Sequence, residues 1–472
     1  MKLIEKNLIF RKKELLEFAS ISGDWNPIHF DNEFSRRYVS EEPIVHGIHI
    51  LIKSLNKYLN NKKCLINQLQ CNFLIPIMPD ISYQLYLETK NDLSDNLYIY
   101  REKNLVFNCN LIYLDCIVKF KNNHFPLPDP KSYPLSPTFS ELRNNTGEIE
   151  LKANLSLIES KYNNLYNSIS NYSLASLIST SKLVGMICPG LNSIYSSLLI
   201  KFSEDNSLKN LNWEVNSISK VFIPIGISIK SAGLTGSIKA FYRDPPIKQK
   251  TIKQLNKLIR NKSIIEKNIL IIGGSRGIGE LTSKLLCIRK SKITITYSQG
   301  KKDMLSILNE INDFGLKANY FQLDILESKK LKKFISENNF DEIYLFASPR
   351  IKESTKNIFD LQLFEKYNSY YVKPLIDIAN SLSEKVSFKT KLFYPSTIFL
   401  DEEKNNTFIE YKASKLLGEN ICKNVTEKYP NITFISKRLP RLLTDQTIKA
   451  NKTLIHNSLE VIENILDLMQ EN

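Results

Sequence analysis

The stretch Ser22-Gly23-Asp24-Trp25-Asn26-Pro27-Ile28-His29 places a carboxylate and an imidazole close together in the chain. The Asn26-Pro27 pair between them disfavours helix, because a proline biases the residue before it towards extended conformations. An Asp and a His on one side of a substrate can remove one proton and supply another. Taken singly, Asp24 would be a turn residue and His29 a surface histidine, so their shared motif is what favours a catalytic pair.

A second motif, Pro43-Ile44-Val45-His46-Gly47-Ile48, begins the apolar run that continues to Leu55. The two motifs together resemble the signature of the MaoC-like, (R)-specific enoyl-thioester hydratases, which have the hotdog fold. Every fixed position of the G-D-x-N-P-x-H pattern agrees. The resemblance implies that Asp24 and His29 act on a 3-hydroxyacyl or enoyl thioester. It also implies that the amide of Gly47 donates to the enolate oxygen, a role that a helix N-terminus can fill.

Length and composition indicate a soluble, multi-unit protein. The 472 residues predict roughly three units, and 42% hydrophobic with 24% charged residues is typical of globular chains. Residues 1–13 lack a signal-peptide core, and no apolar run is long enough to span a membrane. Seven cysteines without a C-x-x-C pair favour free thiols and a cytoplasmic location, and we expect no metal.

The net charge of +15 is spread along the chain and mixed with acidic residues, which disfavours a nucleic-acid site. A basic surface would instead steer the phosphates of an acyl-CoA or an acidic acyl-carrier protein towards the chain. We therefore expect a thioester partner and no nucleic acid.

The first half of the chain predicts α+β structure. Residues 1–120 are expected to be a hotdog domain, with helices over 14–22 and 44–59 and strand-like runs between 64 and 120. Residues 121–245 read as a proline-rich strap and a second hotdog, making a double hotdog. The part from 150 to 243 has no histidine, so this second hotdog is expected to be non-catalytic, with Pro189-Gly190 in the place of His46-Gly47. Residues 246–266 read as a basic, part-helical linker.

Residues 267–472 predict an α/β Rossmann domain with a doubly wound parallel sheet. The apolar run Ile269–Ile272 leads into Gly273-Gly274-Ser275-Arg276-Gly277-Ile278-Gly279 and then a helix through Leu286. A glycine loop between a strand and a helix lets backbone amides hold a pyrophosphate. Alone, this motif is a weak indication.

Further residues make the third unit similar to the short-chain dehydrogenase/reductase superfamily. They are Asp324-Ile325, the pair Tyr411 and Lys415 in Tyr-x-x-x-Lys, and Pro440-Arg441-Leu442-Leu443-Thr444. The resemblance implies that the cofactor is bound by Gly273, Ser275, Arg276, Gly277, Ile278, Gly279, Asp324, Ile325, Ala347, Tyr411, Lys415, Pro440 and Thr444.

Tyr411 and Lys415 lie four residues apart, which places both on one face of a helix. The Lys415 ammonium should favour the phenolate and lower the pKa of Tyr411, which would exchange a proton with the substrate oxygen. Family resemblance also assigns the nicotinamide ribose to Lys415. The carbonyl-orienting serine is expected at Ser396, with Thr397 as the other candidate.

Two positions depart from the family pattern. Leu345-Phe346-Ala347-Ser348-Pro349 replaces the usual N-A-G segment, and Tyr371 stands where the relay asparagine is expected. The run Tyr297-Ser298-Gln299, at the end of the second expected strand, offers no acid for ribose hydroxyls, whereas Arg276 and Lys301-Lys302 could meet a 2′-phosphate. We therefore predict NADP(H).

Together these features predict a two-step enzyme. The C-terminal unit would reduce a 3-oxoacyl thioester with NADPH, and the hotdog would dehydrate the product to a 2-enoyl thioester. Two alternatives remain. One is a hydratase and 3-hydroxyacyl dehydrogenase in acyl degradation. The other is a non-catalytic acyl-binding hotdog joined to an atypical reductase. By family resemblance we expect a homo-oligomer.

Overall fold

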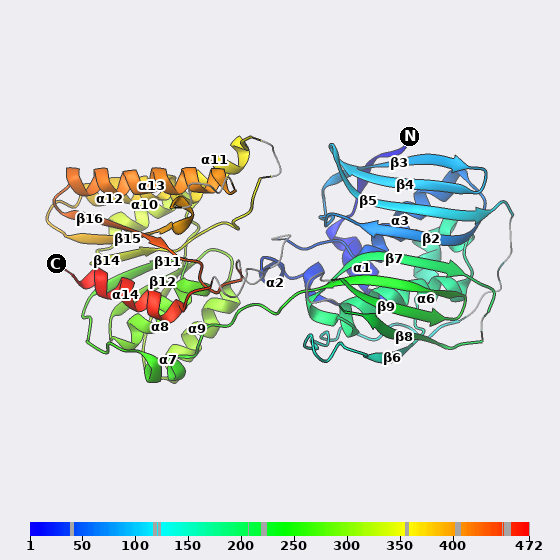
Figure 1. The fold of residues 1–472 in the computed structure, drawn as a ribbon, viewed down its shortest axis with the longest axis horizontal. Coiled ribbons are helices and arrows are strands. Elements are labelled where there is room, and N and C mark those ends of the chain that lie inside the picture. The colour runs from blue at the N-terminus through cyan, green and yellow to red at the C-terminus, as the bar shows by residue number, and fades with distance from the viewer. Residues whose placement is uncertain are drawn as a thin grey trace. The chain divides into compact units, whose positions relative to one another are not determined.

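A computed structural model describes residues 1–37, 42–116, 120, 124–205, 207–218, 224–354, 358–401, 407–445, 447 and 455–471. The chain forms two compact units, Met1–Pro245 and Pro246–Asn472 (Figure 1). Among the described residues, no helix is long and apolar enough to cross a membrane.

The first unit is built on one ten-stranded antiparallel sheet, in the order β1-β3-β4-β5-β2-β7-β10-β9-β8-β6. Its first five strands are β1 (Lys2–Ile9), β2 (Leu65–Phe73), β3 (Ser82–Asn91), β4 (Ser94–Arg101) and β5 (Asn104–Leu114). The other five are β6 (Thr146–Glu150), β7 (Ser193–Phe202), β8 (Asn210–Ser217), β9 (Pro224–Ser231) and β10 (Leu234–Tyr242). Adding five to each number in the order 1-3-4-5-2 gives 6-8-9-10-7. The two halves therefore repeat one topology and meet at the β2–β7 pair, where Leu69 lies opposite Ile200.

The helices of this unit are α1 (Lys12–Ser22), α2 (Asn32–Ser35), α3 (Gly47–Tyr58), α4 (Leu155–Lys161), α5 (Asn163–Tyr166) and α6 (Asn171–Lys182), with short turns at Pro27–His29, Leu59–Asn61, Leu183–Ile187 and Gly190–Asn192. The longer ones, α1, α3 and α6, lie on one face of the sheet (Figure 1). Helix α3 buries Ile48, Leu51 and Leu55, as the apolar run predicts. A hotdog layout, with a helix held against a curled antiparallel sheet, is thus present in the first half.

The repeat corrects one expectation. In the first half α3 follows β1 and precedes β2, so its counterpart between β6 and β7 is α6. Pro189-Gly190 lies after α6, whereas His46-Gly47 lies before α3, and the two pairs do not correspond. Helix α6 is rich in serine, and most of its buried hydroxyls donate to main-chain carbonyls, as Ser179 does to Ala175. Such a segment lacks the apolar periodicity by which helices are recognised.

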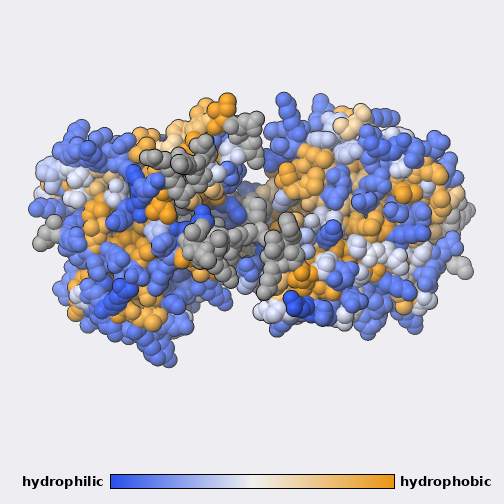
Figure 2. All heavy atoms as spheres, viewed as in Figure 1, coloured by the Kyte–Doolittle hydropathy of each residue, from blue (hydrophilic) through white to orange (hydrophobic). Residues whose placement is uncertain are grey.

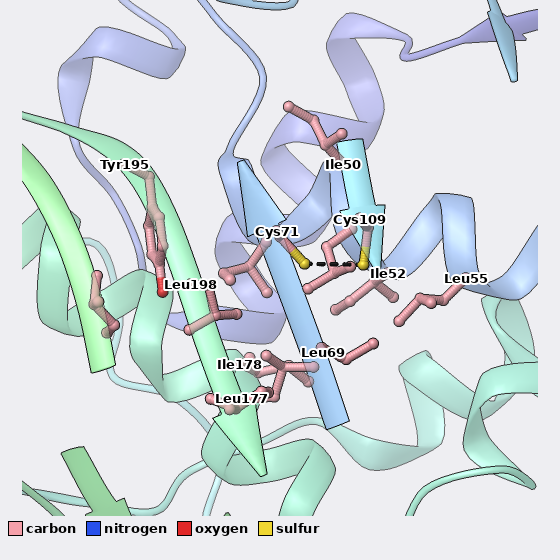
Figure 3. Close-up of a cluster of buried hydrophobic side chains, with 14 of the residues drawn as sticks. Ile50, Ile52, Leu55, Leu69, Cys71, Cys109, Leu177, Ile178, Tyr195 and Leu198 are labelled. Atoms are coloured by element: carbon pink, nitrogen blue, oxygen red, sulfur yellow. Dashed lines mark hydrogen bonds between the residues drawn. The ribbon is translucent and has the colours of Figure 1, made fainter. Parts of the chain in front are cut away.

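A single apolar core joins the two halves, with residues from α3, α6 and both sets of strands. This shared core explains why two compact units form where length alone predicts three. Cys71 on β2 and Cys109 on β5 lie opposite each other inside this core, with a thiol hydrogen bond of 3.0 Å between the sulfurs (Figure 3). All seven cysteines are free thiols.

The second unit has a six-stranded parallel sheet in the order β13-β12-β11-β14-β15-β16, which is the doubly wound arrangement predicted. Its strands are β11 (Asn268–Ile272), β12 (Lys292–Tyr297), β13 (Asn319–Gln322), β14 (Glu342–Leu345), β15 (Thr390–Thr397) and β16 (Ile432–Leu439). Its helices are α7 (Ile252–Leu258), α8 (Gly277–Ile288), α9 (Lys301–Asp313), α10 (Ser328–Glu337), α11 (Leu361–Tyr371), α12 (Lys373–Ser383), α13 (Ile409–Lys428) and α14 (Ser458–Gln470), with a short turn at Ile398–Leu400. One apolar cluster packs α7, α8, α9 and α14 on one face, and another packs α10 to α13 on the other.

Residues 246–266, expected as a linker, lie inside the second unit. Helix α7 buries Ile252 and Leu255 in the cluster that also contains α8. The main-chain N–H groups of Ile247 and Arg260 donate to Asp445 and Glu463. Because lysines surround the few apolar residues of this segment, its buried face is hard to recognise from the sequence. Residues 117–119, in the last strand-like run expected before residue 120, and residues 221–223, in the expected second hotdog, lie outside the described residues.

Candidate active sites

The Asp24–His29 motif is held by two local turns. Helix α1 ends at Ser22, and Gly23 follows with a positive φ of 72°, which glycine adopts without steric cost. Asn26 is extended, as its place before proline requires, and its side chain accepts the N–H of Ile28. Pro27–His29 then forms a single 3₁₀ turn, a small helical element that the sequence interpretation excluded. Pro27 is tolerated there because the first N–H of a helix needs no intrahelical acceptor.

Asp24 and His29 face each other in the interior of the first unit. The distance between Asp24 Oδ2 and His29 Nε2 is 4.0 Å, and the two residues are 3% and 8% exposed. His29 Nδ1 lies 2.7 Å from the carbonyl oxygen of Ile44. Because a carbonyl can only accept, Nδ1 carries the ring proton, and the lone pair of Nε2 is directed to the Asp24 side.

His46 and Gly47 lie next to this pair at the start of α3. The rings of His46 and His29 stack with centroids 3.6 Å apart, and His46 Nε2 donates to the main-chain oxygen of Asp24 at 3.1 Å. Gly47 is the first residue of α3, so its N–H lacks an intrahelical acceptor. A side chain at Gly47 would press on Tyr195 and Phe73, with a Cβ 3.2 Å from Tyr195 Cβ.

Asp24, His29 and His46 also bring three potential metal ligands within 4.8 Å of one another. His46 already uses its Nε2–H for the carbonyl of Asp24, and His29 uses its Nδ1–H for Ile44. Each imidazole is thus oriented by a carbonyl acceptor and keeps one nitrogen without a proton, Nε2 of His29 and Nδ1 of His46.

In the second unit, the glycine loop lies between β11 and α8. Gly273 and Gly277 have positive φ angles of 83° and 60°. A Cβ at Gly273 would lie 2.6 Å from the N atom of Ala347, and one at Gly279 would lie 2.3 Å from the oxygen of Gly273. The loop is thus as close-packed as a pyrophosphate cradle requires, and α8 points its N-terminus at it. A Cβ at Gly277 would contact Thr444, 3.7 Å away.

Tyr411 and Lys415 are buried on α13, with 6% and 3% of their surface exposed. Lys415 Nζ donates to the carbonyl oxygen of Pro395 at 2.6 Å and lies 3.7 Å from the ring centroid of Tyr371. Thr397 hydrogen-bonds the Tyr411 phenol through its side chain.

Comparisons with known proteins match a segment of each unit to a family. Residues 3–79 match the family described as "MaoC like domain", and residues 269–468 match the "NAD dependent epimerase/dehydratase family". One chain therefore joins a segment that matches the MaoC-like family to a segment that matches the NAD-dependent epimerase/dehydratase family.

A curated relative and several solved structures were also found. The mitochondrial 3-hydroxyacyl-[acyl-carrier-protein] dehydratase of Arabidopsis thaliana is 35% identical over 46 residues, which span 10% of this chain and 28% of the relative. FolM alternative dihydrofolate reductase 1 from Brucella canis, complexed with NADP, has 18% identity and a TM-score of 0.39, covering 45% of this chain and 90% of that one. A short-chain dehydrogenase/reductase from Serratia marcescens has 14% identity and a TM-score of 0.40, covering 44% and 91%.

The second half of the first unit contacts the MaoC-like motif directly. Ser181, on α6, donates to Asp24 Oδ2 at 2.7 Å. Asn26 Nδ2 donates to the carbonyl oxygen of Gly185 at 2.7 Å, and the N–H of Trp25 points to the sulfur of Met186. A Cβ at Gly185 would lie 2.2 Å from Asp24 Oδ1. The sequence interpretation missed these residues, because nothing local marks Ser181 or Gly185 as neighbours of Asp24.

Burial dominates the electrostatics of the MaoC-like site. It raises the pKa of Asp24 to about 7, against the opposing effect of the hydrogen bonds from Ser181 and Asn26. It lowers the pKa of His29 to about 4, and it also lowers that of His46. Near neutral pH, His29 is thus uncharged, and a substantial fraction of Asp24 carries its proton.

Burial also governs Tyr411 and Lys415, which corrects the expected effect of the lysine. The pKa of Tyr411 is raised by burial, with Thr397 acting in the opposite direction. Burial lowers the pKa of Lys415 to about 7. Lys415 donates to Pro395 and covers the face of Tyr371, so the group that favours the Tyr411 phenolate is Thr397.

Ser396 and Thr397 have different surroundings. Ser396 donates to Glu419 at 2.5 Å, and Glu419 is paired with Arg438. Thr397, the other candidate, is the residue beside Tyr411. Of the two candidates, it is thus Thr397 that the structure places beside the phenol of Tyr411. The physical reason is that adjacent residues on a strand point to opposite faces.

The remaining predicted cofactor residues lie at the ends of the parallel strands. Asp324 and Ile325 follow β13, Ala347 follows β14, and Pro440 follows β16. Asp324 accepts the hydroxyl of Ser298 at 3.3 Å. Arg276, expected at a 2′-phosphate, lies 3.8 Å from Asp445 in an ion pair. That acid, one residue after Thr444, was not singled out in the sequence.

Proposed function

We propose that this chain catalyses two consecutive steps on an acyl thioester. The second unit would reduce a 3-oxoacyl thioester to the 3-hydroxyacyl compound with NADPH. The first unit would then remove water to give the 2-enoyl thioester. The observation that carries the proposal is the 4.0 Å gap between Asp24 Oδ2 and His29 Nε2. An oxygen atom in that gap can lie about 2.8 Å from both groups, which is hydrogen-bond distance.

That oxygen would be the 3-hydroxyl of the substrate, or water in the reverse direction. His29 Nε2 takes the α-proton, and the electrons of the C–H bond form the double bond as the C–O bond breaks. Asp24 donates its proton to the departing hydroxyl, which leaves as water. The imidazolium then returns a proton to the carboxylate, which restores both groups. The Gly47 amide, at the positive end of α3, would stabilise the negative charge that builds up on the thioester oxygen as the α-proton leaves.

In the second unit, the glycine loop would hold the pyrophosphate and Lys415 the nicotinamide ribose. The bound cofactor would supply hydride to the substrate carbonyl. Tyr411 gives its proton to the oxygen that becomes the hydroxyl, and the Thr397 hydrogen bond supports the phenolate left behind. NADP(H) is supported by the absence of an acid at Tyr297-Ser298-Gln299. To bind the 2′-phosphate, Arg276 would have to leave its ion pair with Asp445 and pair with the phosphate.

We expect the thioester to be carried by coenzyme A or an acyl-carrier protein. The net charge of +15 would attract either, and the Arabidopsis relative is a dehydratase of carrier-bound substrates by its name.

We also propose a homo-oligomer. Ile376 on α12 and Leu416 and Leu417 on α13 are more than 40% exposed, and Figure 2 shows a further apolar group over the start of α11.

The dehydration step is tested in reverse, without the reductase. A 2-enoyl thioester is incubated with the full chain, and loss of enoyl absorbance reports hydration. We expect hydration by the wild-type chain and by Tyr411→Phe, and none by Asp24→Asn. Hydration that survives in Asp24→Asn would remove the basis of the proposal. NADPH loss with 3-oxoacyl thioesters tests the other step, with Tyr411→Phe as the inactive control.

One observation favours a second candidate for the C-terminal unit. The ring of Tyr371 covers Lys415 at 3.7 Å, and the Tyr371 hydroxyl bonds Ser348 at 2.6 Å, where the family pattern has an asparagine. These contacts would suit an atypical reductase that acts on a carbonyl other than a 3-oxoacyl thioester. The first unit would then bind acyl groups without catalysing a reaction. The other alternative is that the chain runs both steps in reverse, as a hydratase and a 3-hydroxyacyl dehydrogenase. Cofactor choice distinguishes the two directions, because a preference for NAD would favour oxidation.

A further inference from the structure

The carboxylate of Asp24 is fixed differently at its two oxygens. Oδ1 accepts the N–H of Asn26 at 3.3 Å and faces Gly185, where a Cβ would lie only 2.2 Å away. Oδ2 faces His29 at 4.0 Å and receives the Ser181 hydroxyl at 2.7 Å. Oδ2 is therefore the oxygen available to a substrate, and its one direct side-chain hydrogen bond among the described residues comes from the other half of the unit.

We propose that Ser181, in the half without a catalytic motif, is a positioning residue that aims Asp24 Oδ2 at the substrate and sets when this carboxyl releases its proton. The inference rests on the proposed dehydration and adds a role for the second half. A hydroxyl that donates to a carboxylate stabilises the charged form, so it strengthens Asp24 as an acid. It also prevents rotation of the carboxylate away from His29.

In the described chain, no titratable side chain near Asp24 donates to Oδ2 as Ser181 does. His29 and His46 flank it, but both are uncharged near neutral pH, and His46 bonds only the main-chain oxygen. Lys182, next to Ser181, has its aliphatic chain against Gly23, and its ammonium pairs with Asp129 at 2.7 Å.

The helix offers a matched control. Ser179 lies on α6 two residues before Ser181 and is also buried, at 3% exposed against 2%. Its hydroxyl donates to the carbonyl of Ala175 in the same helix. Ser179→Ala therefore removes the same hydroxyl from the same helix without touching Asp24. Ser181→Thr keeps a hydroxyl at the functional position and serves as the conservative variant.

The test measures the pH dependence of dehydration for the full chain and for each variant. A hydrogen bond to a charged group is worth about 1.5–3 kcal/mol, which corresponds to a pKa shift of about one to two units. We expect Ser181→Ala to move the alkaline limb of the kcat/KM profile upward by about that much and to lower kcat about 10- to 100-fold. Ser181→Thr should restore most of both, and Ser179→Ala should change neither.

Direct titration of the Asp24 carboxyl separates this inference from the proposed reaction. The carboxyl band of the full chain is followed by infrared difference spectroscopy and assigned by its absence in Asp24→Asn. The midpoint should rise in Ser181→Ala whether or not any thioester is turned over. If the midpoint shifts but the chain does not dehydrate the thioester, the proposed reaction is refuted and the effect of Ser181 on Asp24 still stands. An unshifted midpoint, or an equal shift in Ser179→Ala, would overturn the role of Ser181.

Discussion

Replacing Gly185 with alanine places a methyl group where the Asp24 carboxylate now lies. The new Cβ would stand 2.2 Å from Oδ1 and 2.6 Å from both Cγ and Oδ2, distances well inside van der Waals contact. Either the carboxylate swings away from His29 or the Leu183–Ile187 turn shifts. Overpacking of this kind costs about 1–3 kcal/mol of unfolding free energy. We expect Gly185→Ala to abolish dehydration and to leave NADPH oxidation by the second unit intact.

Both tryptophans of the chain, Trp25 and Trp213, lie in the first unit. Urea denaturation followed by tryptophan fluorescence therefore reports the stability of this unit. The stability loss of Gly185→Ala should fall below about 0.5 kcal/mol when Asp24 is also replaced by alanine, because the colliding atoms are then gone. An equal loss in both backgrounds would show that the clash is with something other than Asp24 and would refute the packing described here.

Three further outcomes follow from the two sites. The kcat/KM for dehydration should fall as pH rises through about 7, because Asp24 then loses the proton that it must donate; a profile flat from pH 6 to 8 would contradict this. Thr397→Ala should lower reductase activity about 100-fold, whereas Ser396→Ala should lower it far less, as NADPH oxidation assays would show. Asp445→Asn should release Arg276 and tighten NADPH relative to NADH in fluorescence titrations, and unchanged selectivity would exclude Arg276 from that role.

Much of the architecture could be predicted from local patterns. The apolar run after Gly47 predicts α3, and the Ile269–Ile272 run with its glycine loop predicts β11, α8 and the parallel sheet. These features depend on short-range periodicity and on backbone geometry that only glycine adopts easily, so sequence alone reveals them.

Contacts distant in sequence could not be predicted in the same way. Ser181 and Asp24 are 157 positions apart in the sequence. Their contact can be recognised only in the folded chain, where the two halves share one sheet and one core. Helix α6 was not identified from the sequence, and its serines are buried and donate mostly to main-chain carbonyls. The choice between Ser396 and Thr397 depended on which face of β15 lies against Tyr411 of α13, and a shift of one residue along the strand reverses that face.

Burial likewise changes electrostatic expectations drawn from sequence. Lys415 next to Tyr411 on a helix face suggests a lowered phenol pKa, but both groups are almost fully removed from water. Desolvation then raises the pKa of Tyr411 and lowers that of Lys415 to about 7. Sequence identifies the pair of residues, and only their surroundings decide which protonation state they hold.

The most direct test of the two-step account is a mass-spectrometric time course that begins with a 3-oxoacyl thioester and NADPH. We predict that the wild-type chain forms the 2-enoyl thioester, that Asp24→Asn stops at the 3-hydroxyacyl compound, and that Tyr411→Phe leaves the starting material unchanged. Formation of the enoyl product by Asp24→Asn, or the absence of any reduced acyl species with the wild-type chain across short and long thioesters, would contradict it.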